Sequence, residues 1–358
     1  MENKTKVLAI NLPAFHRVPE NDLWWGEGFT EWDNVKSGVP YFKGHNQPFV
    51  PVDGYYYDLA KKEDIIHQID LAKKYGIYGF IYYHYWFGND KQIFEKPVEV
   101  VRDDKSIDFH YCFCWANETW RTTWHGKNPN GVLLEQVYGD EKEWKKHIDY
   151  LLTFFKDEKY IKMDNKPMLF IYKPNEIPHY DEMMDLFEEE VRKAGFDGLY
   201  VVEYISSKNR GLNSARSSAV YEFEPLYSFF FDVPLFNKGK RFLCKKLHVI
   251  DFQDYEKACK WIVNRKRTYQ GKPIFKTFFA GWDNSARKGR DSMVLRNCTP
   301  ETFKKYFALA LAKDRKDATN EFMVINAWNE WSEGAYLEPD EQHKYAYLEA
   351  IKDCLDKQ

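Results

Sequence analysis

Eight apolar segments follow one another along the chain, and helix-like segments separate most of them. The apolar segments are rich in Ile, Val, Phe and Tyr, which is typical of strands covered on both faces. They are Val7–Phe15, Tyr78–Trp86, Phe109–Trp115, Pro167–Tyr172, Leu199–Ile205, Ala219–Pro225, Pro273–Ala280 and Glu321–Trp328. Eight buried strands alternating with helices predict one α/β domain over residues 1–358, folded as a (β/α)₈ TIM barrel with long βα loops.

The segments between these strands carry apolar residues at helical spacing. In Lys61–Tyr75, the side chains of Ile65, Ile69 and Ala72 share one face, and Gly76 follows the last turn. The other expected helices are Glu141–Phe155, Ile177–Ala194, Asp254–Arg267, Pro300–Lys316 and His343–Lys357. A doubly wound open sheet is the alternative architecture, but no Gly-x-Gly-x-x-Gly turn follows the first strand.

Three connections are longer than an ordinary βα loop: residues 17–57, 208–218 and 228–250. Long connections in compact domains usually carry function or are disordered. Residues 17–57 include Trp24, Trp25 and Trp32, a poor composition for disorder. We therefore expect this segment, called the flap below, to be ordered and to lie beside the functional site.

Charge and residue spacing exclude several classes of function. The 52 basic and 55 acidic residues give a net charge of −3, so no nucleic-acid partner is expected. No window approaches the roughly 18 apolar residues of a membrane span, and no signal-peptide pattern follows the N-terminus. We expect a cytoplasmic chain without membrane insertion. The six cysteines lack Cys-x-x-Cys spacing and no His-Glu-x-x-His pattern occurs, so neither a metal nor a cofactor is expected; the oligomeric state is left open.

Polar and aromatic residues gather where the predicted strands end, which is where barrel enzymes build their active sites. Polar residues at the end of a single strand often only form hydrogen bonds at the protein surface. Five or more such clusters at the same end of one barrel predict an active site. The candidate substrate-binding residues are Trp25, Glu31, Trp32, His84, Tyr85, Trp115, Asn117, Glu118, Trp120, Glu203, Trp282, Asp283, Arg287, Trp328 and Asn329. Among them Trp25, Trp32, Trp120 and Trp282 are candidate platforms for stacking sugar rings.

Two carboxylates lie three residues apart after the eighth strand. Glu330 and Glu333 stand among tryptophans, and Gly334 lets a substrate approach the backbone. Cleavage of a glycosidic bond needs one group to give a proton and one to take it. The alternative interpretation is a pair of solvated loop acids. We predict that Glu330 and Glu333 are catalytic and act on an oligo- or polysaccharide.

With these residues in view, the chain resembles the WbsX-type proteins of bacterial polysaccharide loci, which are related to glycoside hydrolase family 99 (endo-α-mannosidases and endo-mannanases). The matching motifs are Phe29-Thr30-Glu31-Trp32-x-Asn34-Val35, Phe42-Lys43-Gly44-His45-x-Gln47-Pro48, Gly79-Phe80-x-Tyr82-Tyr83-His84-Tyr85-Trp86-Phe87, Trp115-Ala116-Asn117-Glu118, Gly281-Trp282-Asp283-Asn284 and Trp328-Asn329-Glu330-Trp331-x-Glu333-Gly334. They span nearly the whole chain in order. The tie to family 99 rests mainly on the last motif and the barrel.

The resemblance implies a role for each glutamate. Glu330 would be the base that deprotonates the sugar 2-hydroxyl, and Glu333 the acid that protonates the leaving oxygen, in a retaining route through a 1,2-anhydro sugar. Glu333 should then have a raised pKa while Glu330 stays ionised. Two alternatives stay open: a glycosyltransferase or transglycosylase of surface-polysaccharide (O-antigen or capsule) biosynthesis, and a non-catalytic carbohydrate-binding barrel. The sugar, its linkage, and internal or terminal cleavage are not specified by the sequence.

Overall fold

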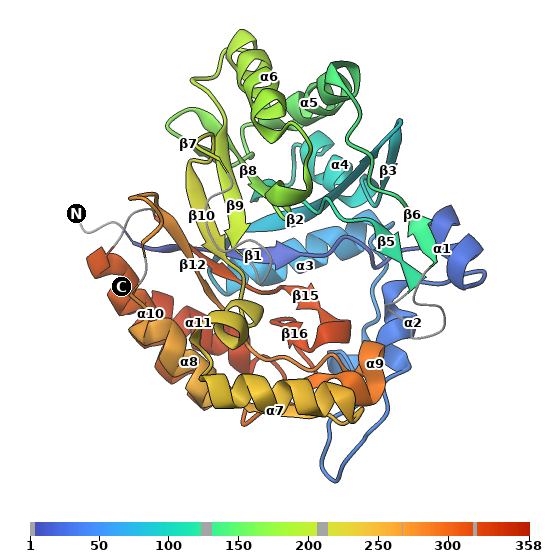
Figure 1. Ribbon diagram of the computed structural model, residues 1–358, viewed down its shortest axis with the longest axis vertical. Helices are drawn as coiled ribbons and strands as arrows, with labels where there is room; N and C mark the ends of the chain where they lie inside the picture. The colour runs from blue at the N-terminus through green and yellow to red at the C-terminus, as the bar shows by residue number, and fades with distance from the viewer. Residues whose placement is uncertain (1–3, 123–130, 206–213, 267, 318–320) are drawn as a thin grey trace.

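The eight predicted strands close into a barrel (Figure 1). The computed structural model describes residues 4–122, 131–205, 214–266, 268–317 and 321–358. All neighbouring barrel strands are parallel, and β1 pairs with both β14 and β2, which closes the ring. In ring order the strands are β1 (Lys6–Asn11), β2 (Ile77–Gly88), β4 (His110–Trp115), β8 (Lys166–Ile171), β9 (Tyr200–Ile205), β10 (Ala219–Glu222), β12 (Ile274–Phe278) and β14 (Phe322–Ile325). The predicted TIM barrel is therefore confirmed.

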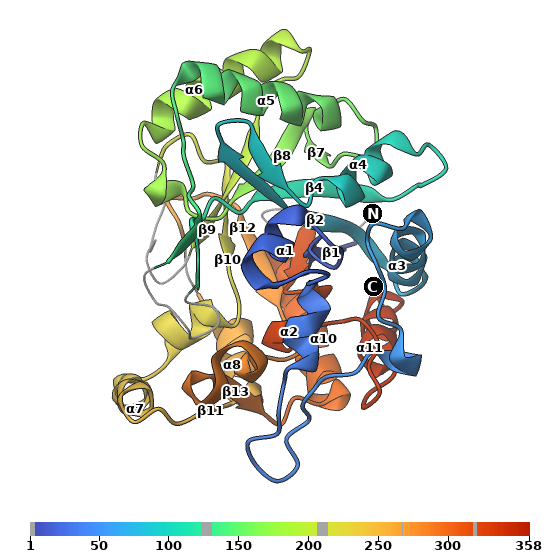
Figure 2. The ribbon, with the colours of Figure 1, turned by 90° about the vertical axis from the view of Figure 1, so that its right-hand side faces the viewer.

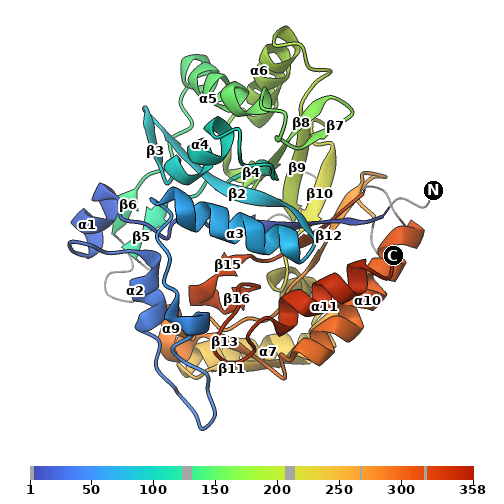
Figure 3. The same ribbon diagram turned by 180° about the vertical axis from the view of Figure 1, so that it is seen from behind.

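Helices cover the outside of the barrel. Figures 1 and 3 place α5 and α6 on one side and α10 and α11 on the opposite side. The helices after the flap are α3 (Lys62–Lys74), α4 (Lys96–Asp103), α5 (Glu141–Phe155), α6 (Tyr180–Lys193), α7 (Leu235–Lys246), α8 (Tyr255–Asn264), α9 (Ser285–Lys288), α10 (Pro300–Asp317) and α11 (Ala346–Leu355). All six expected helices are present, within a few residues at their ends. Helices α4, α7 and α9 were not predicted.

Short strands also lie in the connections between the barrel strands and the helices. They are β3 (Lys91–Ile93), β5 (Trp120–Arg121), β6 (Val132–Leu134), β7 (Lys162–Met163), β11 (Asp251–Asp254), β13 (Met293–Arg296), β15 (Asn329–Glu330) and β16 (Ala335–Tyr336). Of the expected long connection 208–218, the part before residue 214 lies outside the described residues. One continuous apolar cluster holds side chains from every barrel strand, so strands and outer helices share a core.

The flap forms two short helices, α1 (Pro19–Trp25) and α2 (Glu31–Lys36). A capping box starts α2: Asp33 accepts a hydrogen bond from the backbone N–H of Thr30, while the Thr30 side chain caps the backbone at Asp33. Trp32 then packs between Phe15 and Trp331, with ring centroids 4.5 and 5.6 Å away. This packing fixes α2 against the segment that carries Glu330 and Glu333.

Candidate active site

A cavity of about 430 Å³ opens at the carboxyl ends of the barrel strands. Its walls come from the ends of β1, β2, β4, β8, β10, β12 and β14, so residues far apart in sequence meet there. The lining residues are Leu12, Tyr83, Tyr85, Ala116, Glu118, Trp120, Tyr172, Phe223, Leu226, Trp282, Asn284, Arg287, Lys288, Glu330 and Glu333. The convergence expected from the strand ends is therefore present, and both candidate glutamates belong to it.

A short hairpin after β14 positions the two glutamates. Strand β15 pairs with β16 in antiparallel register, and Trp331–Glu333 form a 3₁₀ turn between them. The Asn329 amide accepts a hydrogen bond from the Leu12 backbone N–H (2.7 Å) and donates to the Leu12 carbonyl (3.0 Å), which ties the hairpin to β1. Gly334 has φ 61°, and a Cβ there would lie 2.7 Å from the Asp283 nitrogen. Only glycine fits this turn.

Glu330 lies deeper than Glu333 and is almost completely buried. Its Oε2 atom has no hydrogen-bond partner among the described residues. Burial, followed by the nearby charge of Glu333, raises the pKa of Glu330 to about 8, and the Arg287 guanidinium opposes this shift. The expectation of an ionised Glu330 is therefore wrong for the unliganded protein, because the sequence did not show which carboxyl would be desolvated.

Arg287 links the flap to the glutamate turn. Its guanidinium donates to Glu333 (3.0 Å) and to Glu31 (2.7 Å), and its side chain is only 11% exposed. The Ser332 hydroxyl also donates to Glu31 (2.6 Å). The prediction that Glu31 lines this cavity is therefore wrong. Glu31 lies in an adjoining small cleft, where its ion pair holds Arg287 next to Glu333.

Several predicted binding residues do line the cavity. Glu118 forms an ion pair with Lys173 (3.0 Å), and its side chain remains 30% exposed. The Trp120 ring packs edge-on against Tyr85, with centroids 5.3 Å apart. Trp282 also contributes to the wall. Trp25 lies in an adjoining small cleft that shares Tyr85 and Trp120 with the cavity. Their roles in binding remain predictions.

His84 and Trp115 point away from the cavity, so the prediction that they line it is wrong. His84 Nε2 lies 2.9 Å from Nε2 of His147 on α5, and burial lowers the pKa of His84 to about 3. The Trp115 indole donates to the Trp86 carbonyl (3.0 Å). Successive strand residues face opposite sides, so Tyr85 faces the barrel interior while His84 faces the helices.

Trp32 and Trp328 are core residues and not sugar platforms. The Trp32 indole donates to the Tyr57 carbonyl (2.8 Å), and its side chain is 4% exposed. Trp328 is fully buried and donates to Gln68 on α3 (3.2 Å). Their surroundings leave no face open to a substrate, which corrects the prediction for both.

Three other predicted residues also lie behind the cavity wall. Asn117 is fully buried and bonds the backbone of Lys173 through both ends of its amide. Glu203 is fully buried and accepts a hydrogen bond from the Ser217 hydroxyl. The Asn329 amide joins the hairpin to the end of β1 through its two hydrogen bonds with the Leu12 backbone. Each satisfies backbone or side-chain partners, so none reaches the cavity as predicted.

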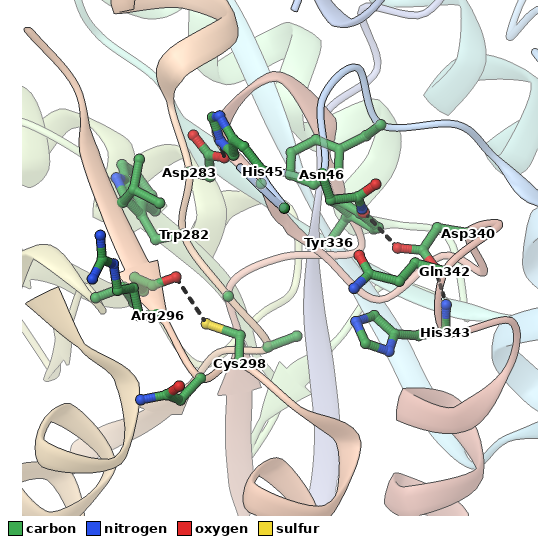
Figure 4. A pocket seen from close by; sticks show the side chains of 18 of the residues that line it. His45, Asn46, Trp282, Asp283, Arg296, Cys298, Tyr336, Asp340, Gln342 and His343 are labelled. Carbon is green, nitrogen blue, oxygen red and sulfur yellow. Dashed lines mark hydrogen bonds and ion pairs between the residues drawn. The ribbon is translucent and has the colours of Figure 1, made fainter. Parts of the chain in front are cut away.

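Asp283 lies in a second cavity of about 490 Å³ and not in the first (Figure 4). Burial opposes its ionisation, but hydrogen bonds from His45 Nε2 (2.6 Å), Ser285 and Gln47 outweigh burial and lower the pKa of Asp283. Its backbone N–H donates to the Glu333 carbonyl (2.7 Å). Asp283 therefore supports the Glu333 turn from the far side.

Four polar lining residues were not among the predicted site residues: Tyr83, Tyr172, Asn284 and Lys288. Tyr83 could have been inferred, because it lies two residues from Tyr85 and therefore on the same face of β2. Lys288 places a second cation beside Arg287.

Within the described ranges, no three His, Cys, Asp or Glu side chains are grouped to hold a metal ion. No described helix combines the length and apolar character needed to cross a membrane.

The chain is similar to several known proteins in sequence or in fold. WxcX proteins from two strains of Xanthomonas campestris pv. campestris are each 30% identical over 353 residues; this is 98% of the present chain and 50% of each relative. The chain thus spans about half the length of these curated relatives. The fold is similar to that of a GH99 endo-alpha-mannosidase from Bacteroides thetaiotaomicron, with a TM-score of 0.57 and 15% identity over 98% of this chain and 96% of that one.

A protein described as glycoside hydrolase-like gives the same TM-score of 0.57, with 14% identity over 99% of this chain and 94% of that one. At these identities the two structures show a shared barrel fold and nothing about activity. Family membership rests on the sequence, since residues 7–351 match the family described as Glycosyltransferase WbsX. The chain therefore belongs to the WbsX family.

Proposed function

We propose that this chain is a glycoside hydrolase whose catalytic pair is Glu330 and Glu333. The observation that carries the proposal is the pair itself: two carboxyls on one turn, in a cavity lined by aromatic side chains. Glu330 is buried, and its Oε2 atom has no hydrogen-bond partner among the described residues. Such environments push the two pKa values apart, which is how carboxylate pairs divide acid and base work. The chain would act as one catalytic domain, with the flap bracing one side of the site.

The proposed roles follow the family resemblance. Glu330 takes the proton of the sugar 2-hydroxyl, the 2-oxygen bonds to C1, and the bond from C1 to the leaving oxygen breaks as Glu333 protonates that oxygen. Water then opens the 1,2-anhydro ring at C1, giving its proton to Glu333, while Glu330 returns its proton to the 2-oxygen. The configuration at C1 is retained, and neither carboxylate attacks carbon.

These roles constrain where the shared proton sits. In the free protein, burial and the charge of Glu333 raise the pKa of Glu330 to about 8, which favours a protonated Glu330 near neutral pH. The reacting complex needs that proton on Glu333. A sugar 2-hydroxyl that donates to Glu330 Oε2 supplies the missing partner, and a hydrogen bond to the charged form favours ionisation. Substrate binding would therefore move the proton from Glu330 to Glu333.

The proposed substrate is an α-linked mannan or a bacterial polysaccharide. Tyr85 and Trp120 offer aromatic faces beside the glutamates, and Glu118 and Lys288 offer polar contacts. The fold shared with an endo-alpha-mannosidase supports mannose-containing chains as the first to test.

Glycosyl transfer is the second candidate, and the family description is the observation that favours it. In that case the same acid–base pair would pass the glycosyl group to a sugar hydroxyl in place of water. The described strands close into a barrel, whereas a doubly wound open sheet is typical of nucleotide binding. We propose a glycan as the glycosyl donor for such a reaction.

Incubation with mannans and bacterial polysaccharides, without any nucleotide sugar, tests the proposal. We expect new reducing ends to accumulate, as measured by a reducing-sugar assay and by mass spectrometry of the products. Longer chains without new reducing ends would instead indicate transfer. Glycan binding without any change in the chains would leave a carbohydrate-binding protein and contradict both candidates.

A further inference from the structure

Helix α7 contains no buried residue, although it carries several large apolar side chains. The exposed fractions are 84% for Phe236, 72% for Phe242 and 53% for Leu243, with 59% for Leu247 just after the helix. Figure 2 shows α7 at the outer edge of the molecule. Helices of globular proteins normally bury their apolar face, and an exposed apolar face of this kind marks an interaction site.

The same segment is strongly basic. Residues 235–249 contain Lys238, Lys240, Arg241, Lys245 and Lys246 and no Asp or Glu, whereas the whole chain has a net charge of −3. Of these, Arg241 is turned toward the protein, where it donates to the Phe229 carbonyl (2.6 Å) and pairs with Asp251 (3.1 Å). The segment is therefore a local positive patch on a slightly negative molecule.

The apolar and basic side chains are arranged along one exposed face. Helical spacing puts Phe236, Leu243 and Leu247 in one stripe, with Lys246 beside it. Lys240 lies within the stripe, and its ammonium donates a hydrogen bond to the Phe252 carbonyl (2.9 Å). Phe and Leu side chains flanked by lysines are typical of helices that lie in a membrane interface, where the apolar groups enter the acyl boundary and the lysines meet anionic headgroups.

We propose that α7 binds the surface of an anionic phospholipid bilayer, lying in the interface without crossing it. A cavity of about 810 Å³ runs from the inner side of α7 toward the barrel. This cavity shares four lining residues with the catalytic cavity: Leu226, Trp282, Asn284 and Lys288. Docking through α7 would therefore bring the catalytic cavity to the membrane surface, within reach of glycans attached there. The binding itself does not depend on the proposed catalytic activity.

Co-sedimentation of the 358-residue chain with lipid vesicles tests this inference. We expect binding to vesicles of phosphatidylglycerol and phosphatidylcholine, much weaker binding to pure phosphatidylcholine, and a decrease as salt is raised. The triple variant Phe236→Ser/Leu243→Ser/Leu247→Ser should lose at least about tenfold in vesicle affinity. The matched control Leu23→Ser/Leu309→Ser removes exposed leucines elsewhere and should bind like wild type.

The basic contribution is tested separately. Lys246→Gln should weaken binding to anionic vesicles by about fivefold. Lys240→Gln should weaken it less, because the Lys240 ammonium already donates to the Phe252 carbonyl. Lys142→Gln/Lys257→Gln, which removes two exposed lysines on other helices, should not weaken it. Circular dichroism melting curves confirm that each variant is folded. Hydrogen exchange of residues 235–249 should slow with anionic vesicles and not with neutral ones.

Three outcomes would overturn the inference. The first is no binding to anionic vesicles at low salt, and the second is an equal loss of binding in the variants and their controls. The third is self-association of the wild-type chain in sedimentation velocity that the triple variant abolishes. In that case a second copy of the chain, and not a lipid surface, covers α7.

Discussion

Two buried arginines, Arg265 and Arg287, each gather carboxylates beside the barrel, but the two clusters differ in what they leave unsatisfied. Arg265 donates to Glu222 (2.6 Å) and Glu224 (2.6 Å), and also pairs with Asp232. Glu224 gains further hydrogen bonds from the Ser228 backbone and hydroxyl. The charges of this cluster are paired, and none of its four charged residues lines the cavity that contains Glu330 and Glu333.

The Arg287 cluster is open. Arg287 pairs with Glu31 and Glu333, yet Glu330 beside them keeps one carboxylate oxygen without a partner and faces a cavity of about 430 Å³. Buried polar groups are normally hydrogen-bonded, so an unsatisfied one needs an explanation, and the proposed function supplies one in a substrate hydroxyl. The two carboxylate clusters have similar compositions but differ in hydrogen bonding and in access to a cavity, and under the proposed function only the Arg287 cluster takes part in catalysis.

The largest expected difference between the clusters concerns turnover. Glu330→Gln and Glu333→Gln should each lower kcat by roughly 10²–10⁴-fold, the usual contribution of a general acid or base. Glu224→Gln should keep near wild-type kcat, because its hydrogen bonds serve the fold. Reducing-end release is measured at a temperature where circular dichroism shows all three variants folded. Equal losses in all three would erase the distinction.

Replacing each arginine in turn compares how much the two clusters contribute to the stability of the fold. Arg265→Met should lower the free energy of unfolding by about 3–5 kcal/mol, because it leaves the buried carboxylates of Glu222 and Glu224 and the partly buried carboxylate of Asp232 uncompensated. Arg287→Met should cost less stability, since the Glu333 side chain is 24% exposed and can be hydrated, but it should lose turnover. Urea denaturation of both variants gives the two values. A larger stability loss for Arg287→Met would contradict the division.

Two tryptophans extend the same contrast to the aromatic residues. Trp32→Ala should destabilise the fold by about 3–5 kcal/mol, as expected for a core aromatic. Trp120→Ala should cost less stability and instead weaken glycan binding by about 1 kcal/mol, or roughly fivefold. Thermal melts and isothermal titration with a bound glycan separate the two effects. Unchanged glycan affinity in a folded Trp120→Ala variant would remove Trp120 from the site.

The pH dependence of kcat/KM tests whether Glu330 and Glu333 share one proton during turnover. The pair works with one proton, and this form is lost as pH rises through the Glu330 pKa of about 8. The value of kcat/KM should therefore fall about tenfold per pH unit above pH 8. The falling limb should persist in Glu224→Gln. A flat profile between pH 7 and 10 would show that the shared proton is not used.

The barrel could be predicted from sequence because its strands are short apolar runs of a recognisable kind. The position of Glu330 and Glu333 at a strand end followed from the same pattern. Helix α7 was not predicted, because its apolar side chains face outward and the segment resembled a long loop. Its apolar side chains are exposed and add nothing to the core, so the pattern that revealed the other helices is missing.

The direction of individual side chains was predicted less well. His84 and Tyr85 are neighbours in sequence, yet one faces α5 and the other faces the cavity. Treating a strand end as one cluster loses this alternation. The pKa of Glu330 also depends on burial and on Arg287, which comes from a different strand end. No local pattern specifies such contacts between distant segments.

A comparison of leaving groups tests the central claim most directly: that Glu330 and Glu333 are the catalytic base and acid. The substrates are the natural glycan and an aryl glycoside of the same sugar with a good leaving group, which needs no protonation. We expect the aryl glycoside to restore much of the kcat/KM of Glu333→Gln and none of that of Glu330→Gln. Wild-type turnover of the natural glycan by both variants, or rescue of Glu330→Gln alone, would contradict the account.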